Sequence, residues 1–210
     1  KYDEKVMNGA LHIYSGLKRI IKKYDLNGFT LRCFDLIGEY KNTACLAFAL
    51  LNEEGLLAAC EGDIPSLLTM LFIKECSGQS AFQANPSRID IQNENVIFAH
   101  CTLPLNMAKK YELTTHFESG LGIGVRGKLD KGPVSVLKIS PKLKDVLCVQ
   151  GEIEDNLTLP NYCRTQIQVK MERDEMIEFL NQSFGNHVLI AYGDICGDFL
   201  TLYHFFLDRA

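Results

Sequence analysis

The chain has 210 residues, of which 47% are hydrophobic and 10% aromatic, enough for a sizeable buried core in one large or two small domains. Its formal net charge is −4, and its lysines and arginines are scattered along the sequence. Nothing in this distribution corresponds to the basic surface that binds nucleic acid or an anionic membrane. We therefore expect neither a nucleic-acid partner nor a membrane partner.

The eight cysteines are spread along the chain, mostly within apolar stretches, and no two have the Cys-x-x-Cys spacing of a zinc ribbon or redox motif. We expect most of them to be reduced core residues. The sequence has no signal-peptide pattern, and its longest apolar stretch is much shorter than a membrane span. These features favour a cytoplasmic protein, where thiols stay reduced.

The first predicted element is an amphipathic helix over residues 4–23, where apolar side chains repeat at intervals of three and four. No strand precedes this helix, and the chain begins with Lys1 rather than a methionine. We therefore expect the sequence to be a fragment whose N-terminal part is missing.

This helix belongs to a predicted α/β portion that extends over residues 1–110. Its predicted elements are strand 29–34, buried helix 44–51, strand 56–60, helix 64–76, and strands 80–84 and 95–101. Asp63 can cap the helix that begins at residue 64, and Pro65 suits its first turn. Gly55 stands where a left-handed residue ends the preceding helix.

The pattern changes near residue 113 to alternating apolar residues with regular turn signals, which predicts an antiparallel β-barrel-like unit over residues 111–172. Helical spacing returns at Arg173, followed by a predicted strand over 187–192 and a helix over 196–208. We expect this C-terminal segment, residues 173–210, to return to the α/β layer. The predicted fold class is therefore α/β plus β.

Gly122, Gly124 and Gly127 match the spacing of the dinucleotide-binding fingerprint. That motif requires a strand before it and a helix after it, whose N-terminus receives the pyrophosphate. Turn residues occupy positions 128–133 instead. We interpret the glycines as part of a strand or hairpin of the β-unit, where they allow close backbone approach.

Several acids and histidines are candidates for a functional site. Glu61 follows a predicted strand at the end where ligands of open sheets collect, although it could also be a buried acid paired with Arg or Lys. Asp63 is explained by a helix cap alone. His100, His116 and His187 could be ligands or core residues, and His187 stands at the start of the returning segment. We predict that Glu61 and His187 meet in one cleft, which would suit a divalent metal such as manganese.

Seven short segments carry a family resemblance. They are Ala59-Cys-Glu-Gly-Asp-Ile-Pro-Ser66, Ala84-Asn-Pro-Ser-Arg-Ile-Asp90, Ala99-His-Cys-Thr102, His116-Phe-Glu-Ser-Gly120, Gly132-Pro-Val134, and Gly185-Asn-His-Val188 with Tyr192-Gly-Asp194. Together they resemble the C-terminal half of L-fucose isomerase-like proteins, in the fucose/arabinose isomerase family, over nearly the whole chain from about residue 30. The resemblance implies an α/β layer followed by a barrel-like domain, and manganese-dependent interconversion of aldoses and ketoses.

The resemblance also implies roles for individual residues. Glu61 corresponds to a metal-binding and catalytic glutamate, and His187 to a metal-binding histidine. Classical fucose isomerases have a second catalytic carboxylate at the position of Ala84, so the second acid/base stays open. Its local candidates are Asp63, Asp90 and Glu118.

The predicted site therefore uses Glu61 and Asp63 in catalysis, and Glu61 and His187 as ligands of Mn²⁺ or another divalent metal. The candidates for binding sugar hydroxyls are Arg88, His100 and Arg164. The expected substrate is a monosaccharide and the expected assembly a homo-oligomer. The alternative is a non-catalytic carbohydrate-binding or regulatory relic of the same fold.

Overall fold

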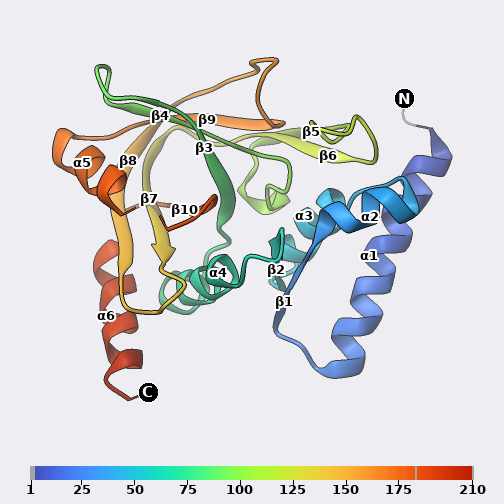
Figure 1. Cartoon of the computed structure of the whole chain (residues 1–210), viewed down its shortest axis with the longest axis horizontal. Coiled ribbons are helices and arrows are strands. Elements are labelled where there is room, and N and C mark those ends of the chain that lie inside the picture. The colour runs from blue at the N-terminus through green and yellow to red at the C-terminus, as the bar shows by residue number, and fades with distance from the viewer. Residues whose placement is uncertain (1–2, 183, 210) are drawn as a thin grey trace.

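The computed structural model describes residues 3–182 and 184–209 and combines a small α/β portion with a closed β-barrel (Figure 1). In chain order the elements are α1 (Glu4–Tyr24), β1 (Gly28–Leu31), α2 (Cys33–Tyr40), α3 (Cys45–Glu53), β2 (Leu57–Cys60), α4 (Ile64–Ser77), β3 (Phe82–Asp90), β4 (Asn95–His100), the short 3₁₀ helix η1 (Leu105–Met107), β5 (Lys110–Thr114), β6 (Gly124–Lys128), β7 (Gly132–Ile139), β8 (Val146–Asn156), β9 (Thr165–Lys170), α5 (Arg173–Asn181), β10 (Val188–Tyr192) and α6 (Cys196–Leu207).

The α/β portion contains the parallel pair β1 and β2, in which Gly28 lies opposite Leu57. Helix α3 is almost entirely buried, as its uninterrupted apolar sequence predicts, and packs against α1. Asn52 near the end of α3 donates to the carbonyl of Ala58 and accepts from its N–H, both at 2.9 Å. These two bonds fix the short connection between α3 and β2.

The barrel is antiparallel and closes in the order β10, β3, β4, β9, β8, β7. An antiparallel barrel-like unit was predicted over residues 111–172, but β5 and β6 of that range form a separate two-stranded sheet. The barrel interior is filled by side chains that alternate along the strands. They include Phe82, Phe98, Val136, Val149, Ile167, Val169 and Ile190. Helix α4 lies between the two portions of the molecule, because it contacts β1 and β2 on one side and β7 and β10 on the other.

The C-terminal strand differs from its prediction. β10 pairs with β3 and β7 inside the barrel and does not return to the parallel pair of the α/β layer. The barrel also takes in β3 and β4, which the sequence pattern had grouped with the α/β portion. An apolar run predicts that a strand is buried but does not specify its partner. Closure of the barrel supplies hydrogen bonds to both edges of β10, and this decides the pairing.

The strand predicted over 29–34 is also shorter than expected. β1 ends at Leu31, and Cys33 begins the eight-residue helix α2. This helix has apolar residues at positions 33, 34, 36, 37 and 40, at intervals of one, two, one and three. Such a short run is ambiguous between helix and strand.

The glycine-rich segment forms a hairpin, as predicted. β6 pairs with β5, and Gly127 lies opposite Tyr111. A Cβ added at Gly127 would lie 2.1 Å from Leu103 Cδ2, and one at Gly122 would lie 2.7 Å from the backbone nitrogen of Thr43. These glycines therefore allow close packing, and no helix begins at residue 126.

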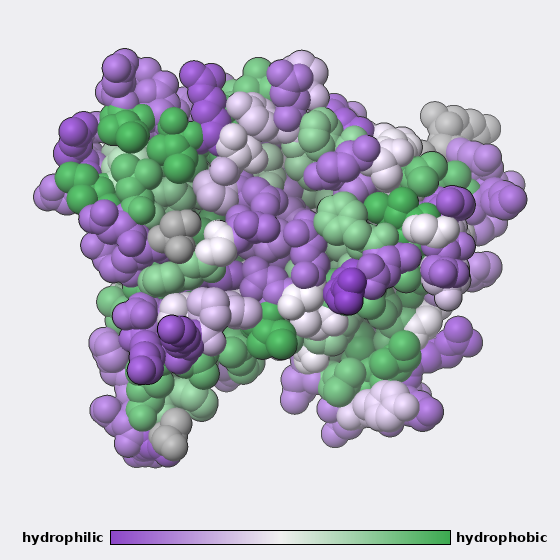
Figure 2. All heavy atoms as spheres, viewed as in Figure 1, coloured by the Kyte–Doolittle hydropathy of each residue, from purple (hydrophilic) through white to green (hydrophobic). Residues whose placement is uncertain are grey.

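Two surface properties complete the description. Among the described residues, no helix has the length and apolar character needed to cross a bilayer. Hydrophilic residues gather near the centre of the face shown in Figure 2, where β2 ends beside the barrel. The functional candidates of the α/β portion lie at this end of β2.

The contact between β1 and β2 gives a test of the fold. A Cβ at Gly28 would lie 2.9 Å from Leu57 Cβ and 3.0 Å from the Leu57 carbonyl oxygen, which is backbone and cannot move aside. We expect Gly28→Ala to lower the free energy of urea-induced unfolding by about 1–3 kcal/mol.

Gly38→Ala is the matched control, because a Cβ there meets nothing within 4 Å and the residue lies in α2. It should raise the unfolding free energy by about 0.5–1 kcal/mol. Equal stability of the Gly28→Ala variant and the parent chain would contradict the close approach.

Candidate functional site

The turn between β2 and α4 presents two acidic side chains. Glu61 has φ +62° and Gly62 has φ +73°, so the chain turns through the left-handed region directly after β2. Non-glycine residues adopt this conformation rarely, and such positions cluster at functional sites. Asp63 ends the turn as the N-cap of α4, and its Oδ1 accepts a hydrogen bond from the Ser66 N–H at 2.8 Å. The predicted cap is confirmed.

His187 directly precedes β10 and reaches both acids. Its side chain is only 2% exposed, its Nδ1 lies 3.0 Å from Asp63 Oδ2, and its Nε2 lies 3.6 Å from Glu61 Oε2. The prediction that Glu61 and His187 meet is therefore confirmed. Within the described part of the chain, Nε2 of His187 is buried without a hydrogen-bond partner.

A second buried histidine lies against the first. His100, the last residue of β4, has its Nε2 4.0 Å from Glu61 Oε1, and its Nδ1 is 2.7 Å from Thr102 Oγ1. Its ring meets the His187 ring edge to face at 5.3 Å between centroids. Burial, and then the neighbouring charge of His187, lower the pKa of His100 to about 3. His100 is therefore neutral at physiological pH.

Asp63 has more hydrogen-bond partners than its role as a helix cap requires. Lys138 of β7 donates to both carboxylate oxygens, at 3.0 and 2.8 Å, and to Ser66 Oγ at 2.6 Å, while its own side chain is 1% exposed. Burial acts to raise the pKa of Asp63, but hydrogen bonds from His187 and Lys138 outweigh it and hold that pKa well below its usual range. Lys138 was not predicted from the sequence as a site residue. The available sign of it is a single lysine within an apolar strand.

Ala84, where the family resemblance implies a second carboxylate in classical fucose isomerases, does not face the site. Ala84 is fully buried in the barrel core and pairs with Val188, so its side chain does not reach the site. The next residue, Asn85, lines the pocket beside Glu61 instead, because successive side chains of a strand face opposite sides. Asn85 Nδ2 donates to the carbonyl of Asn186 at 3.3 Å. Strand β3 therefore offers an amide to the pocket.

The loop after β5 supplies a further acid and imidazole. His116 and Glu118 both line the pocket with Glu61, and His116 Nε2 lies 2.9 Å from Glu118 Oε2. This contact lowers the pKa of Glu118, against the opposing effect of burial. Sequence analysis ranked His116 no higher than the other histidines. The His-Phe-Glu spacing was the available signal.

Neither predicted arginine lines this pocket. Arg88 is exposed and lies 3.9 Å from Asp90 Oδ2. Arg164 donates to the Thr115 carbonyl at 2.6 Å and stacks over the Phe117 ring, with 5.7 Å between its guanidinium carbon and the ring centroid. Arg164 therefore holds the loop that carries His116.

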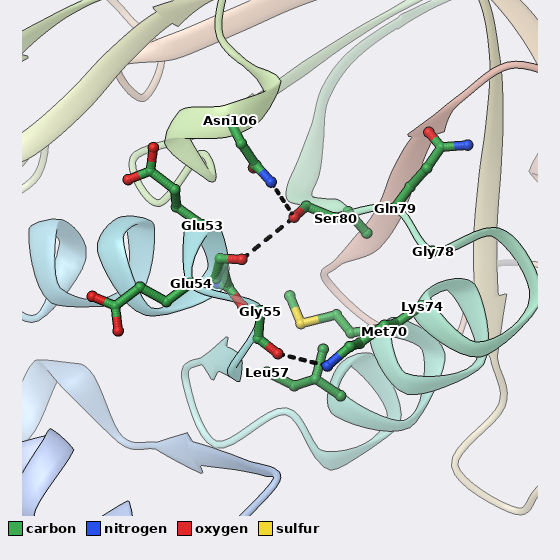
Figure 3. Close-up of a pocket in the computed structure, with 12 residues that line it drawn as sticks. Glu53, Glu54, Gly55, Leu57, Met70, Lys74, Gly78, Gln79, Ser80 and Asn106 are labelled. Carbon is green, nitrogen blue, oxygen red and sulfur yellow. Dashed lines mark hydrogen bonds between the residues drawn. The ribbon is translucent and has the colours of Figure 1, made fainter.

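A separate pocket of about 220 Å³ lies between the end of α3 and α4 (Figure 3). Its polar groups satisfy one another: Asn106 Nδ2 donates to Ser80 Oγ at 2.9 Å, and Lys74 Nζ donates to the Gly55 carbonyl at 2.7 Å. None of the predicted site residues lines it. Its geometry suggests no chemistry.

Several curated proteins resemble this chain in sequence. The chain is similar to sulfoquinovose isomerases. It is 22% identical over 197 residues to the Priestia megaterium protein, with 89% of this chain and 44% of that protein covered. The Alkalicoccus urumqiensis protein is 23% identical over 207 residues, with 92% and 46% covered. The chain thus spans less than half the length of these curated relatives, and no family model matches it.

The site residues fit a divalent cation. Contact with His187 lowers the pKa of Glu61, although burial opposes this, so Glu61 is a carboxylate at neutral pH. Ligand atoms of Cys60, Glu61 and His100 lie within 4.8 Å of one another. A carboxylate at one ring nitrogen of His187, with the other nitrogen buried and unpartnered, is the arrangement typical of a metal-binding histidine. Such oxygen and imidazole donors suit manganese.

Asp63→Asn tests the network beneath the site. It leaves Lys138 buried without its charge partner, so we expect the unfolding free energy near neutral pH to fall by about 3–5 kcal/mol. The pKa of Asp63 is lower in the folded state than in the unfolded state. Its contribution to stability is therefore fully present above the unfolded-state pKa of about 4, and it is lost as the pH falls through the folded-state pKa. The difference between variant and parent should therefore shrink in acid.

Asp130→Asn is the control for this measurement. Asp130 pairs with Lys109 at 2.8 Å, but both side chains are more than half exposed. Its loss should cost less than about 1 kcal/mol in urea unfolding at the same pH. If the two variants lost similar amounts of unfolding free energy, the buried charge of Lys138 would not depend on Asp63 as its partner.

Proposed function

We propose that this chain forms part of a metal-dependent aldose–ketose isomerase that acts on a monosaccharide. The observation that carries the proposal is the convergence of Glu61, His100 and His187 from three separate elements, with Nε2 of His187 buried and unpartnered. The similarity to sulfoquinovose isomerases supports the same reaction class.

Glu61 and His187 would hold the cation, which we propose to be Mn²⁺, and His100 lies close enough to join them. When bound, the cation supplies Lewis-acid polarisation of the carbonyl and hydroxyl oxygens at C1 and C2 of the sugar. Asp63 keeps the His187 ring oriented through Nδ1, and Lys138 keeps Asp63 in place. Asp63 is thus a positioning residue in this proposal rather than a base.

Glu61 would move the proton between C2 and C1 through an ene-diol. Among the candidates for a second acid/base, Glu118 is favoured because it lines the same pocket and contacts His116. Asp90 pairs with Arg88 at the far end of β3, and both Asp63 oxygens are engaged. Asn85 replaces the arginines as the group placed to bind sugar hydroxyls.

A non-catalytic sugar-binding protein is the second candidate. Asn85 favours it, because an amide facing the pocket cannot take a proton as a carboxylate would. The two candidates differ in one observable. Only an isomerase exchanges the C2 proton of a bound aldose with solvent.

The test uses the full-length protein with added Mn²⁺ and a panel that includes L-fucose, L-arabinose and sulfoquinovose. We expect solvent exchange at C2 by NMR with at least one sugar. Glu61→Gln should lower kcat by on the order of 10²–10⁴, the usual contribution of a general acid/base.

Glu112→Gln is the matched control. Glu112 is an exposed residue of β5 paired with Arg126, away from the pocket, and its variant should keep the parent rate. Sugar binding without C2 exchange would select the second candidate. Unchanged turnover in Glu61→Gln would remove Glu61 from the mechanism.

The length of the relatives leads to a further expectation. A chain that spans less than half of each curated relative should show little turnover alone, because positioning groups and homo-oligomer contacts would come from the rest of the protein. Positioning contributes roughly 7–11 kcal/mol to lowering a barrier. We expect the isolated chain to be at least a hundredfold slower than the full-length protein in the same assay, by order of magnitude. Equal rates would contradict this.

A further inference from the structure

Five of the eight cysteines gather around one small pocket beside Glu61. They are Cys33, Cys45, Cys60, Cys101 and Cys163. A buried free cysteine commonly acts as a small apolar residue. These five come from five separate segments of the chain, however, and the fold brings their thiols together with two histidines.

One grouping in this pocket combines sulfur and nitrogen donors. Cys45 is the first residue of α3, Cys101 directly follows β4, and their Sγ atoms are 3.1 Å apart. His116 adds a ring nitrogen, and the ligand atoms of the three residues lie within 4.8 Å of one another. All three side chains are buried. Cys163 lines the same pocket.

We propose that Cys45, Cys101 and His116 form a metal site for a thiophilic ion such as Zn²⁺, with Cys163 as the nearest fourth ligand. Two sulfurs on one tetrahedral zinc lie roughly 3.8 Å apart, so a small outward movement of the two thiols is sufficient. Thiolates with imidazole select zinc over manganese.

His116 can bind the ion through Nδ1 and keep its contact with Glu118. Its Nδ1 now lies 3.0 Å from Ser119 Oγ, and its Nε2 lies 2.9 Å from Glu118 Oε2. Binding through Nδ1 replaces only the Ser119 contact and leaves the carboxylate at Nε2, which is the usual partner of a ligand histidine. The ion would then tie the loop after β5 to α3 and to the end of β4.

The ligands of this ion differ from Glu61 and His187, which we propose for the sugar reaction, although Glu61 lines the same pocket. The proposed ligands are soft, and the inference does not rest on the proposed function. A competing thiol pair, Cys33 and Cys60, has its Sγ atoms 3.0 Å apart next to Glu61. The experiment must separate the two pairs.

The test is a titration of the reduced, metal-free full-length protein with Cd²⁺, whose thiolate complexes absorb in the ultraviolet. We expect one thiolate-bound ion per chain and competition by Zn²⁺. Cys45→Ser and Cys101→Ser should each abolish the absorption, and His116→Gln should weaken binding at least about tenfold while absorption remains. Circular dichroism of the metal-free variants checks that each is folded.

Two controls should bind Cd²⁺ as the parent protein does. Cys76→Ser alters a half-buried thiol of α4 that does not line the pocket, and Glu61→Gln alters a pocket residue that is not one of the proposed ligands. Absence of the absorption in the parent protein would overturn the proposal. So would its survival in both Cys45→Ser and Cys101→Ser, or its loss in Cys33→Ser alone, which would assign the ion to the other pair.

Discussion

The buried charge of Lys138 is the constraint on which the site depends. A lysine that is 1% exposed in a barrel wall needs a fixed anionic partner, because an unpaired charge there costs several kcal/mol. Asp63 supplies that partner while it caps α4, and Ser66 bonds to both. The N-terminus of α4 is therefore held against β7, and the turn that carries Glu61 is held with it.

The same interaction joins the two portions of the molecule. Glu61 belongs to the α/β portion, whereas His100 and His187 come from the barrel, so no single layer contains the site. Strand pairing in the barrel explains why His100 and His187 lie close together. β3 lies between β4 and β10, with Asn85 opposite Ala99 and Ala84 opposite Val188. His100 and His187 each adjoin one of these paired residues, so both lie at the same end of the barrel.

Two sets of donors lie side by side in this region. Glu61, His100 and His187 offer oxygen and nitrogen, whereas Cys45 and Cys101 offer sulfur, with His116 close to both Glu118 and the thiols. The two sets should bind different cations, because thiolates favour soft ions such as zinc and carboxylates favour harder ions such as manganese. In our proposals one set serves sugar chemistry and the other holds the loop that carries Glu118, so loop order would affect the reaction indirectly.

The sequence by itself determined features that depend on local chemistry. Apolar spacing was sufficient for α1, α3 and α4, the Asp63 cap followed from its position before Ile64, and the residues after Gly127 excluded a nucleotide-binding helix. Glu61 and His187 were predicted as partners from their place at element ends and from a family resemblance. Alternation also predicted an antiparallel barrel.

Only the tertiary structure decided which elements are partners. Burial of β10 was evident from its sequence, but barrel closure placed it beside β3 and β7. Lys138 gave no local sign of its partner, because the residues that neutralise it lie far away along the chain. The pocket-facing residue of β3 is Asn85 rather than Ala84, since the pleat and the pairing with β10 determine which side chain points inward. Thiols from five segments likewise meet only through long-range packing, which no periodicity in the sequence records.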